Sequence, residues 1–368
     1  MLSYSEIQHI KGVASQFRIA DGEITHVIQV NSGRINASYK ITVTQETDTV
    51  SYMLQRINTH VFADEKVVMN NALLVTNHLR AKGFETLEFI YTKFGEPLYY
   101  DSTGVFRMTK FIHAEIFQTI TRPKDMFNLG FAVGEFSVGL SDFDATKLGD
   151  TIPNFHNTSH RYQNLLISAV NNVLHSNVPT RVREAEKEID LVNENRELYD
   201  VIVSAINRGD IPLRVTHNDT KLNNVLFDRK TNIPRCLTDL DTVMRGTVLW
   251  DIADAIRSGA NVSTEEERKA FKIKIDLELV KEFLCGFSAG APGMLTKKEI
   301  QLLPVAIQIM PFELGMRYLT DYFDGDIYFG ITNSDDNLVR ARGQFVLAKE
   351  IESHMGEIRQ IVSTVFLN

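Results

Sequence analysis

The sequence contains few of the residues that mark secreted, fibrous or membrane-spanning proteins. Only two cysteines occur among 368 residues, Cys236 and Cys285, and they form no Cys-x-x-Cys pair of the kind that binds zinc. We expect both to be free thiols in a reducing compartment. Nine prolines and 21 glycines are too few for a fibrous or low-complexity chain. No stretch approaches the roughly 20 apolar residues that a membrane-spanning helix requires.

Clustered positive charge is also missing. The chain has 39 Lys and Arg against 47 Asp and Glu, a net charge of −8, and no basic run. This balance argues against nucleic acid or an anionic membrane as a partner. Residues 1–17 place apolar side chains at helical spacing among polar ones and lack the continuous apolar core of a signal peptide. We therefore expect a cytoplasmic protein.

The length predicts more than one folding unit. A chain of 368 residues exceeds the roughly 250–300 residues at which a single core stops growing. With 43% hydrophobic and 23% charged residues, the composition is that of an ordinary globular protein. We expect two lobes with a ligand cleft between them.

The first lobe, residues 1–112, is expected to be an antiparallel sheet with one main helix. Strands are indicated where β-branched and apolar residues alternate with polar ones between turn signals. The helix, Asp64–Ala81, has apolar residues at three- and four-residue intervals and ends before Gly83. The expected strands are Glu23–Val30, Ala37–Thr44, Val50–Ile57, Leu87–Tyr91 and Val105–Phe111.

The second lobe, residues 113–368, is expected to be mostly helical, which makes the fold class α+β. Helical periodicity fails in one β-rich stretch, Leu213–Thr242. A further helix is expected to begin at Trp250. The other expected helices are Asp125–Leu140, Gln163–Leu174, Val182–Ile206, Thr264–Phe287, Lys297–Tyr322 and Asn337–Val365.

The β-rich stretch contains a motif typical of phosphoryl transfer. His217 and Asp219 are followed, after four intervening residues, by Asn224. Kinases use this spacing in the catalytic loop, where the Asp accepts the proton of the attacking hydroxyl and the Asn binds a metal ion. The motif also occurs by chance, because Asp and Asn suit turns.

The residues after Asn224 give the motif its context. A strand, Val225–Phe227, a polar turn and a second strand, Pro234–Leu237, predict a hairpin that brings Asp239 back beside Asn224. An amide and a carboxylate oxygen there, completed by phosphate oxygens, suit magnesium. Asp241 lies two residues further on and is a candidate ligand of a second ion.

Two further features of the sequence are weaker evidence of function. Asp251 and Asp254 fall near the start of a helix, and we interpret them as structural residues, one of which could hold the catalytic loop through its backbone or through His217. The turn Val30–Asn36 contains small residues whose N–H groups could approach ATP phosphates, although most such turns only join two strands.

These residues resemble the aminoglycoside phosphotransferase and choline kinase superfamily, whose signature is His-x-Asp-x-x-x-x-Asn followed by an Asp at a strand end. Within it, the chain is most similar to the bacterial N-acetylhexosamine 1-kinases. The similarity spans nearly the whole chain and includes the stretches Ile211–Asn224, Gly315–Leu319, Gly325–Phe329 and Asn337–Arg340.

The resemblance implies a bilobal, protein-kinase-like fold that uses ATP and Mg²⁺. It implies that Asp219 is the catalytic base and contacts the acceptor, and that adenine lies at the strand between the lobes. By position, the other implied site residues are Asn224, Asp239 and Asp241 for magnesium, Arg317 and Tyr328 for the sugar, and Gly33, Arg34, Asn36, Gln55, Lys110 and Ile112 for the nucleotide.

The chain departs from the superfamily pattern on the third strand. Many members have a Lys there, paired with a helix Glu, whereas this chain has Gln55 and no obvious Glu in the following helix. The N-acetylhexosamine 1-kinases resemble it in having Gln. Arg34 stands where those kinases are expected to have His. The sequence leaves open how the ATP phosphates are neutralised.

The expected reaction is transfer of the ATP γ-phosphoryl group to the anomeric hydroxyl of N-acetylglucosamine or N-acetylgalactosamine. The same chemistry on choline, homoserine, an aminoglycoside or another sugar is the alternative within enzymes. A pseudokinase that only binds nucleotide is a third possibility, against which the retention of Asp219, Asn224 and Asp239 argues. The exact sugar and the oligomeric state stay open.

Overall fold

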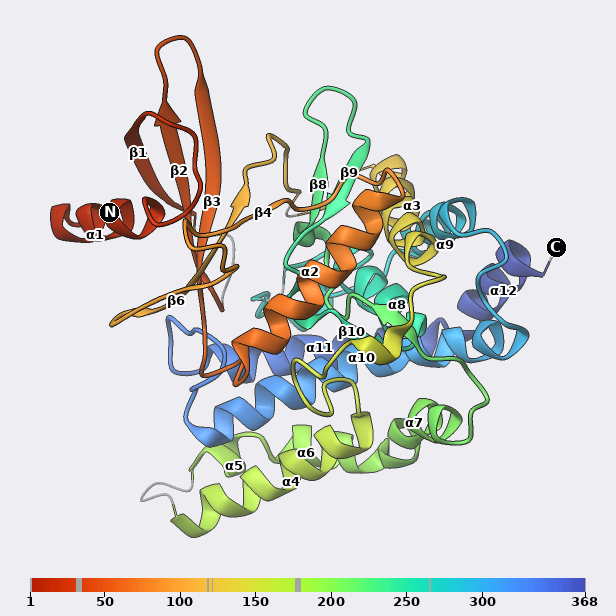
Figure 1. The fold of residues 1–368 in the computed structure, drawn as a ribbon. Coiled ribbons are helices and arrows are strands. Elements are labelled where there is room, and N and C mark those ends of the chain that lie inside the picture. The colour runs from red at the N-terminus through yellow and green to blue at the C-terminus, as the bar shows by residue number, and fades with distance from the viewer. Residues whose placement is uncertain are drawn as a thin grey trace.

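A computed structural model describes residues 2–30, 35–117, 119–120, 122–175, 180–264 and 266–367. The N-terminal sheet stands beside a larger group of helices (Figure 1). This arrangement confirms the predicted α+β class. In the described part of the chain, no helix is both long and apolar enough to cross a membrane. Cys236 and Cys285 are free, as expected.

The sheet is antiparallel throughout and has the order β1-β2-β3-β6-β4, with β5 pairing with β6. The first three strands confirm the sequence prediction to within one residue. The sequence missed β5 and overestimated the length of β4. The strands are β1 (Glu23–Val30), β2 (Ala37–Thr44), β3 (Thr49–Ile57), β4 (Phe89–Ile90), β5 (Tyr99–Asp101) and β6 (Gly104–Lys110).

The two faces of this sheet have different chemistry, because side chains alternate along each strand. One face, with Ile41 and Leu54, forms an apolar core with α1 (Tyr4–Ala14). The other carries Gln55 of β3 directly opposite Arg107 of β6. Arg107 forms an ion pair with a residue beyond the sheet, Asp241, so this polar face is directed toward the helical part of the molecule.

Helix α2 (Glu65–Ala81) joins the sheet to the helical part. Asp64 caps it by accepting hydrogen bonds from two backbone N–H groups of its first turn. Its buried apolar side chains belong to the same core as those of the C-terminal helices. The side chain of Asn71 donates to the carbonyls of Gly149 and Val243, at 2.7 and 2.8 Å. The apolar core is therefore continuous across residue 112, and the division into lobes at that residue stays a prediction.

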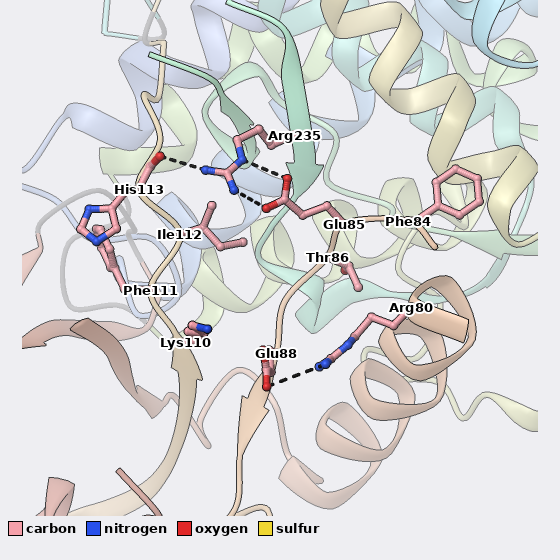
Figure 2. A pocket seen from close by; sticks show the side chains of 10 residues that line it. All are labelled: Arg80, Phe84, Glu85, Thr86, Glu88, Lys110, Phe111, Ile112, His113 and Arg235. Carbon is pink, nitrogen blue, oxygen red and sulfur yellow. Dashed lines mark hydrogen bonds and ion pairs between the residues drawn. The ribbon is translucent and has the colours of Figure 1, made fainter. Parts of the chain in front are cut away.

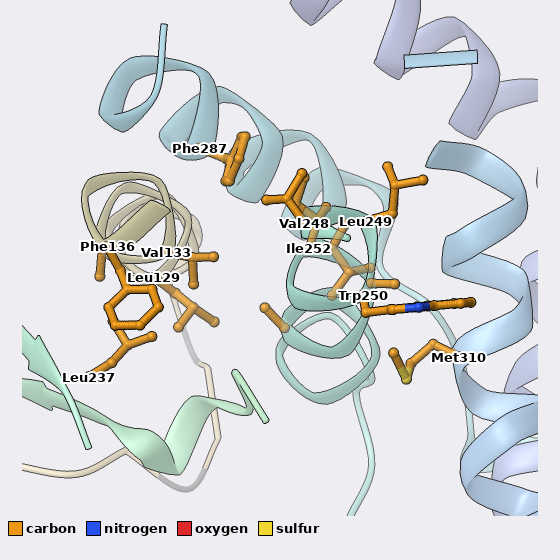
Figure 3. Packing of buried hydrophobic residues seen from close by; sticks show 14 of the residues in the cluster. Leu129, Val133, Phe136, Leu237, Val248, Leu249, Trp250, Ile252, Phe287 and Met310 are labelled. Carbon is orange, nitrogen blue, oxygen red and sulfur yellow. The ribbon is translucent and has the colours of Figure 1, made fainter. Parts of the chain in front are cut away.

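The helical part is built around α3, α8 and α9, whose apolar side chains interlock (Figure 3). Helices α3 and α9 approach closely at two glycines. A Cβ atom on Gly130 would lie 2.0 Å from the carbonyl oxygen of Phe283, and one on Gly286 would lie 2.0 Å from that of Phe127. The main helices are α3 (Pro123–Gly139), α4 (Thr158–His175), α8 (Val248–Gly259), α9 (Leu277–Gly290), α10 (Lys297–Asp324), α11 (Asp336–Ser353) and α12 (Met355–Phe366).

Three predicted helices differ from the structure. The single helix predicted over 182–206 is divided into α5 (Thr180–Glu184), α6 (Glu186–Glu194), a short 3₁₀ turn and α7 (Asp200–Asn207). The helix predicted over 337–365 is interrupted at His354. The helix predicted from Thr264 starts only at Leu277, because Asp276 caps it there and the preceding residues Ile273 and Ile275 insert into the core.

Candidate active site

The catalytic motif lies in a loop that is held from both sides. It follows β7 (Arg214–Thr216), which pairs with β10 (Met244–Gly246). Asn218 has a left-handed backbone with φ of 63°, a conformation that Asn tolerates better than most residues. Its side-chain amide donates to the carbonyl of Thr242 at 2.8 Å. The sequence around the motif therefore fixes a sharp turn immediately before Asp219.

Asp251, in the first turn of α8, anchors this loop. Its two carboxylate oxygens accept hydrogen bonds from the backbone N–H groups of His217 and Asn218, at 2.9 and 2.7 Å. This confirms the prediction that one of the two helix carboxylates holds the loop. Asp254 instead pairs with Arg257 on the same helix. Burial raises the pKa of Asp251 to about 7, against the opposing effect of the two N–H groups.

We expect the substitution Asp251→Ala to destabilise the protein and to lower kcat. It would leave two buried N–H groups without partners, and each such group costs about 1–3 kcal/mol. The free energy of unfolding in urea should fall by about 2 kcal/mol or more. The exposed α6 residue Asp190, changed to Ala, is the matched control. An unchanged unfolding free energy in Asp251→Ala would show that the anchor is dispensable.

His217 connects the loop to the end of the neighbouring hairpin. Its Nε2 donates to the carbonyl of Thr238 at 2.9 Å, and its ring packs edge-on against Phe136. Burial lowers the pKa of His217, so the ring is neutral and carries its proton on Nε2. The motif histidine is thus a structural residue that sets the distance between the loop and residue 238.

The predicted hairpin is present. Its strands, β8 (Val225–Phe227) and β9 (Pro234–Leu237), have the predicted bounds and pair antiparallel. The N–H of Thr238 donates to the carbonyl of Asn224 at 2.7 Å, which places Asp239 beside Asn224. Asp239 itself is left-handed, with φ of 60° and ψ of 56°, so the chain turns sharply at this carboxylate.

Asp219 is surrounded by donors. The Nζ of Lys221 lies 2.5 Å from its Oδ2, and the Nδ2 of Asn224 donates to the same oxygen at 2.9 Å. Burial would raise the pKa of Asp219, but the charge of Lys221 and these hydrogen bonds outweigh it and hold the pKa below its ordinary value. Asp219 is therefore ionised and suited to accept a proton.

Lys221 is a residue that the sequence interpretation missed. Burial opposes its charge, but the carboxylates of Asp219 and Asp239 raise its pKa to about 12. It therefore brings a permanent positive charge to the two predicted functional carboxylates. A Lys two positions after the motif Asp was the available signal.

The surroundings of Asp239 fit a bound cation. Burial and the negative charge of Asp241 raise the pKa of Asp239 to about 6, which indicates negative charge that is incompletely balanced by the protein. Asn224 uses its amide nitrogen on Asp219, which leaves its amide oxygen for another partner. Within the described residues, no group of three or more His, Cys, Asp or Glu could hold a metal.

Asp241 has another role in this structure. Its Oδ1 forms an ion pair with Arg107, and its Oδ2 accepts from the Nδ2 of Asn36 at 2.5 Å. Arg107 comes from β6 and Asn36 immediately precedes β2, and the Arg107 and Asp241 side chains are almost completely buried. Asp241 therefore connects the N-terminal part of the chain to the hairpin, and its binding of a second ion stays a prediction. Asn36, predicted to contact nucleotide, is likewise engaged with Asp241 and with the backbone N–H of Asn58.

Arg107 is the second missed residue. Its Nε donates to the Oε1 of Gln55 at 3.0 Å, while the Nε2 of Gln55 donates to the hydroxyl of Ser38. Gln55 thus orients a guanidinium that comes from the adjacent strand. The polar face of the sheet therefore has a buried cation although its third strand lacks the usual Lys. An Arg between apolar residues in the strand Gly104–Lys110 was the only signal in the sequence.

The segment predicted to bind adenine, around Lys110–Ile112, borders a cavity of about 380 Å³ (Figure 2). Arg235 closes one side by donating to the carbonyl of His113 and pairing with Glu85. Lys110 and Ile112 both line this cavity. The backbone N–H of Lys110 already donates to the backbone carbonyl of Glu88, and the backbone N–H of Phe111 donates to the backbone carbonyl of Ser51. A base that accepts a hydrogen bond from a backbone N–H of this segment would therefore use one from Ile112 onward.

The predicted acceptor residues Arg317 and Tyr328 lie together, on α10 and in the segment that follows it. The guanidinium of Arg317 on α10 lies 4.6 Å from the ring centre of Phe155 and has a long contact of 3.5 Å with the hydroxyl of Tyr328. Asp321 holds the Tyr328 segment by accepting hydrogen bonds from the N–H groups of residues 327–329 and from Asn337. The two remaining predicted nucleotide contacts, Gly33 and Arg34, lie outside the described residues.

Comparison with known proteins gives a family and several similar folds. A model of the phosphotransferase enzyme family matches residues 26–275. An aminoglycoside phosphotransferase from Alicyclobacillus acidocaldarius subsp. acidocaldarius DSM 446 is similar, with 15% identity, 95% of each chain covered and a TM-score of 0.61. A choline kinase from Cryptosporidium parvum Iowa II has 15% identity and a TM-score of 0.59, covering 98% of this chain and 100% of its own. A spectinomycin phosphotransferase in complex with ADP and spectinomycin has 14% identity and a TM-score of 0.55, with 95% and 98% covered.

Proposed function

Since the chain belongs to the phosphotransferase enzyme family, we propose that it transfers the γ-phosphoryl group of ATP to the anomeric hydroxyl of an N-acetylhexosamine. The observation that carries the phosphotransferase part is the contact of Asp219 with Lys221 and Asn224 in one loop. The observation that favours a sugar is the guanidinium of Arg317 over the ring of Phe155, since the next residue, His156, contacts the backbone carbonyl of Asn218 in that loop.

Asp219 acts on the acceptor hydroxyl. As the new bond forms between the acceptor oxygen and the γ-phosphorus, the bond between that phosphorus and the ADP oxygen breaks. The hydroxyl proton passes to the Asp219 carboxylate, whose pKa is low in the free enzyme because Lys221 pairs with it. Its main contribution is therefore to orient the hydroxyl and to receive the proton late in the transfer.

Four side chains supply or hold positive charge for the phosphates. Asn224 and Asp239 would hold magnesium, which offsets the charge on the transferring group when it is bound. Lys221 provides a second positive charge between the two carboxylates. Arg107 takes the place of the missing strand Lys, with Gln55 fixing its orientation. These assignments account for phosphate neutralisation without the usual Lys–Glu pair.

The charge of the proposed acceptor site favours the proposed neutral substrate over the alternative cationic substrates. The similar structures include kinases whose names specify choline or ethanolamine. A cationic acceptor beside the Arg317 guanidinium would be repelled, whereas the hydroxyls and acetamido carbonyl of a sugar accept hydrogen bonds from it. The runner-up is a kinase of another neutral hydroxyl compound. A pseudokinase is disfavoured because Lys221 and Asn224 both contact Asp219.

A coupled ADP-release assay tests this proposal. The purified protein with Mg-ATP is supplied in turn with N-acetylglucosamine, N-acetylgalactosamine, glucose, choline and an aminoglycoside. Turnover with the two N-acetylhexosamines, and a sugar 1-phosphate as product by phosphorus NMR, is the expected result. Turnover with choline or the aminoglycoside but with no sugar would overturn the substrate class.

For Arg317→Ala, we expect the KM for an N-acetylhexosamine to rise at least tenfold, with a much smaller change in the KM for ATP. A tenfold change corresponds to about 1.4 kcal/mol, a reasonable size for one charged hydrogen-bonding group. The exposed Arg183 on α5, changed to Ala, is the matched control. Equal weakening of both substrates would indicate that Arg317 is only structural.

A further inference from the structure

A second guanidinium lies near Arg317. Arg161, in the first turn of α4, has its guanidinium carbon 5.7 Å from the ring centre of Phe155, and Arg317 lies 4.6 Å from the same ring. The Nε of Arg161 donates to the backbone carbonyl of Phe155 at 2.9 Å, which fixes the plane of its fork. Two cationic groups that come from different helices therefore share one aromatic ring.

A buried carboxylate lies next to these cations. Glu313 is one turn before Arg317 on α10, and its side chain is only 1% exposed. Its Oε1 contacts the Nδ1 of His156 at 2.7 Å. Its Oε2 is buried and has no hydrogen-bond partner among the described residues. Buried carboxylate oxygens are normally satisfied, so this oxygen is suited to accept a hydrogen bond from a ligand.

His156 links this cluster to the catalytic loop. Its second ring nitrogen, Nε2, lies 3.1 Å from the carbonyl oxygen of Asn218, the residue immediately before Asp219. The ring is stacked on Trp250, with centroids 5.6 Å apart. An acceptor bound by Glu313 and the two arginines would thus lie close to the catalytic loop, with the His156 side chain between them.

The electrostatics of the cluster are those of a site that disfavours cations. Burial and the neighbouring charge of Arg317 lower the pKa of Arg161 to about 10, although Glu313 opposes this shift. Two guanidiniums face one carboxylate. A protonated amine placed here would meet an excess of positive charge at low dielectric, whereas a neutral ligand with carbonyl and hydroxyl oxygens would satisfy the free donors.

We propose that Arg161 and Glu313 complete the acceptor site with Arg317, and that Arg161 is a specificity residue that selects a neutral amide-bearing sugar over the corresponding cationic amino sugar. The inference rests on the proposed function and adds the basis of its selectivity. Arg161 donates to a carbonyl oxygen of the acceptor, and the free Oε2 of Glu313 accepts from an acceptor hydroxyl. The alternative is that Arg161 only fastens α4 to the loop at Phe155.

The test compares two acceptors that differ in one group, N-acetylglucosamine and glucosamine, at a pH low enough to keep the amine of glucosamine protonated. In wild-type protein we expect kcat/KM to favour N-acetylglucosamine. In Arg161→Met, that preference should fall at least tenfold, while the KM for ATP stays within about twofold of wild type. Arg183→Met is the matched control, because Arg183 is an exposed arginine on α5.

Two further variants separate the effect of side-chain charge from that of side-chain geometry. Arg161→Lys keeps the positive charge but loses the planar fork. It should still discriminate against glucosamine while its KM for N-acetylglucosamine rises. Glu313→Gln should raise the KM for both sugars, since it replaces an acceptor oxygen with a donor. Circular dichroism and thermal unfolding of each variant establish that it is folded.

The outcomes are distinguishable. If wild type phosphorylates N-acetylglucosamine but the Arg161 variants keep the full preference, the selectivity inference is wrong and the proposed function stands. If Arg161→Met lowers kcat/KM for both sugars by the same factor, Arg161 is structural and the inference is again wrong. If wild type acts only on cationic acceptors, the proposed function and the inference both fail.

Discussion

Replacing Asp219 with Asn is expected to lower kcat by about 10²–10⁴-fold, the usual effect of losing a general base. The amide is nearly the same size as the carboxylate but cannot accept the acceptor proton. It would also lose the ion pair with Lys221, whose Nζ lies 2.5 Å from Oδ2. That Lys would then be free to move toward the phosphates or toward Asp239, so nucleotide binding should be retained.

Turnover and nucleotide affinity therefore have to be measured in the same variant. Steady-state ADP release gives kcat, and isothermal titration with ADP and magnesium gives the affinity. The exposed Asp190 on α6, changed to Asn, carries the same charge change away from the site. If Asp219→Asn kept more than half of the wild-type rate, another residue would have to be the base.

Local sequence patterns predicted the catalytic loop and its hairpin well. The motif spacing, the two short strands and the turn between them are set by neighbouring residues, so the bounds of β8 and β9 could be predicted correctly. The position of Asp239 beside Asn224 followed from the hairpin alone. The anchoring carboxylate could be narrowed to Asp251 or Asp254, because both lie in the first two turns of one helix.

Contacts between segments that are distant in the sequence could not be predicted. Asp241 was predicted only as a ligand of a second ion, and the sequence did not reveal that it contacts the Arg107 guanidinium of β6 and the amide of Asn36, the residue before β2. Nothing in the sequence near Asp241 indicates either partner. The role of Gln55 was equally hidden, because its function is to orient Arg107 on the strand opposite.

The segment Gly325–Phe329 is held between α10 and α11 by hydrogen bonds. Asp321 accepts hydrogen bonds from the segment 327–329 and from Asn337. Arg340 donates to the carbonyl of Gly330. The segment that carries Tyr328 is thus held between two helices, with the Tyr328 hydroxyl 3.5 Å from the Arg317 guanidinium.

The second large effect is expected for Asp239→Ala, which should lower kcat/KM for ATP at least about 10²-fold and raise the magnesium concentration needed for half-maximal rate. A factor of 10² corresponds to about 2.7 kcal/mol. Asp239 is the carboxylate that we propose to hold magnesium with Asn224, and burial together with the charge of Asp241 raises its pKa to about 6. Without the Asp239 carboxylate, the ion would lose its proposed charged protein ligand.

Asp241→Asn provides the contrast that separates metal binding from structure. Because Asp241 pairs with Arg107 across a buried contact, its loss leaves an uncompensated guanidinium, which typically costs about 3–5 kcal/mol. Asp241→Asn should therefore lower the free energy of unfolding while leaving the magnesium titration of the folded fraction unchanged. Asp239→Ala should have the opposite effect. It removes a buried charge that the protein only partly balances, so the free energy of unfolding should stay unchanged. The affinity for Mg-ADP, relative to the affinity for ADP alone, should fall. If instead the magnesium dependence moved with Asp241 and stayed fixed in the Asp239 variant, the metal would be held by the other carboxylate and the assignment would be reversed.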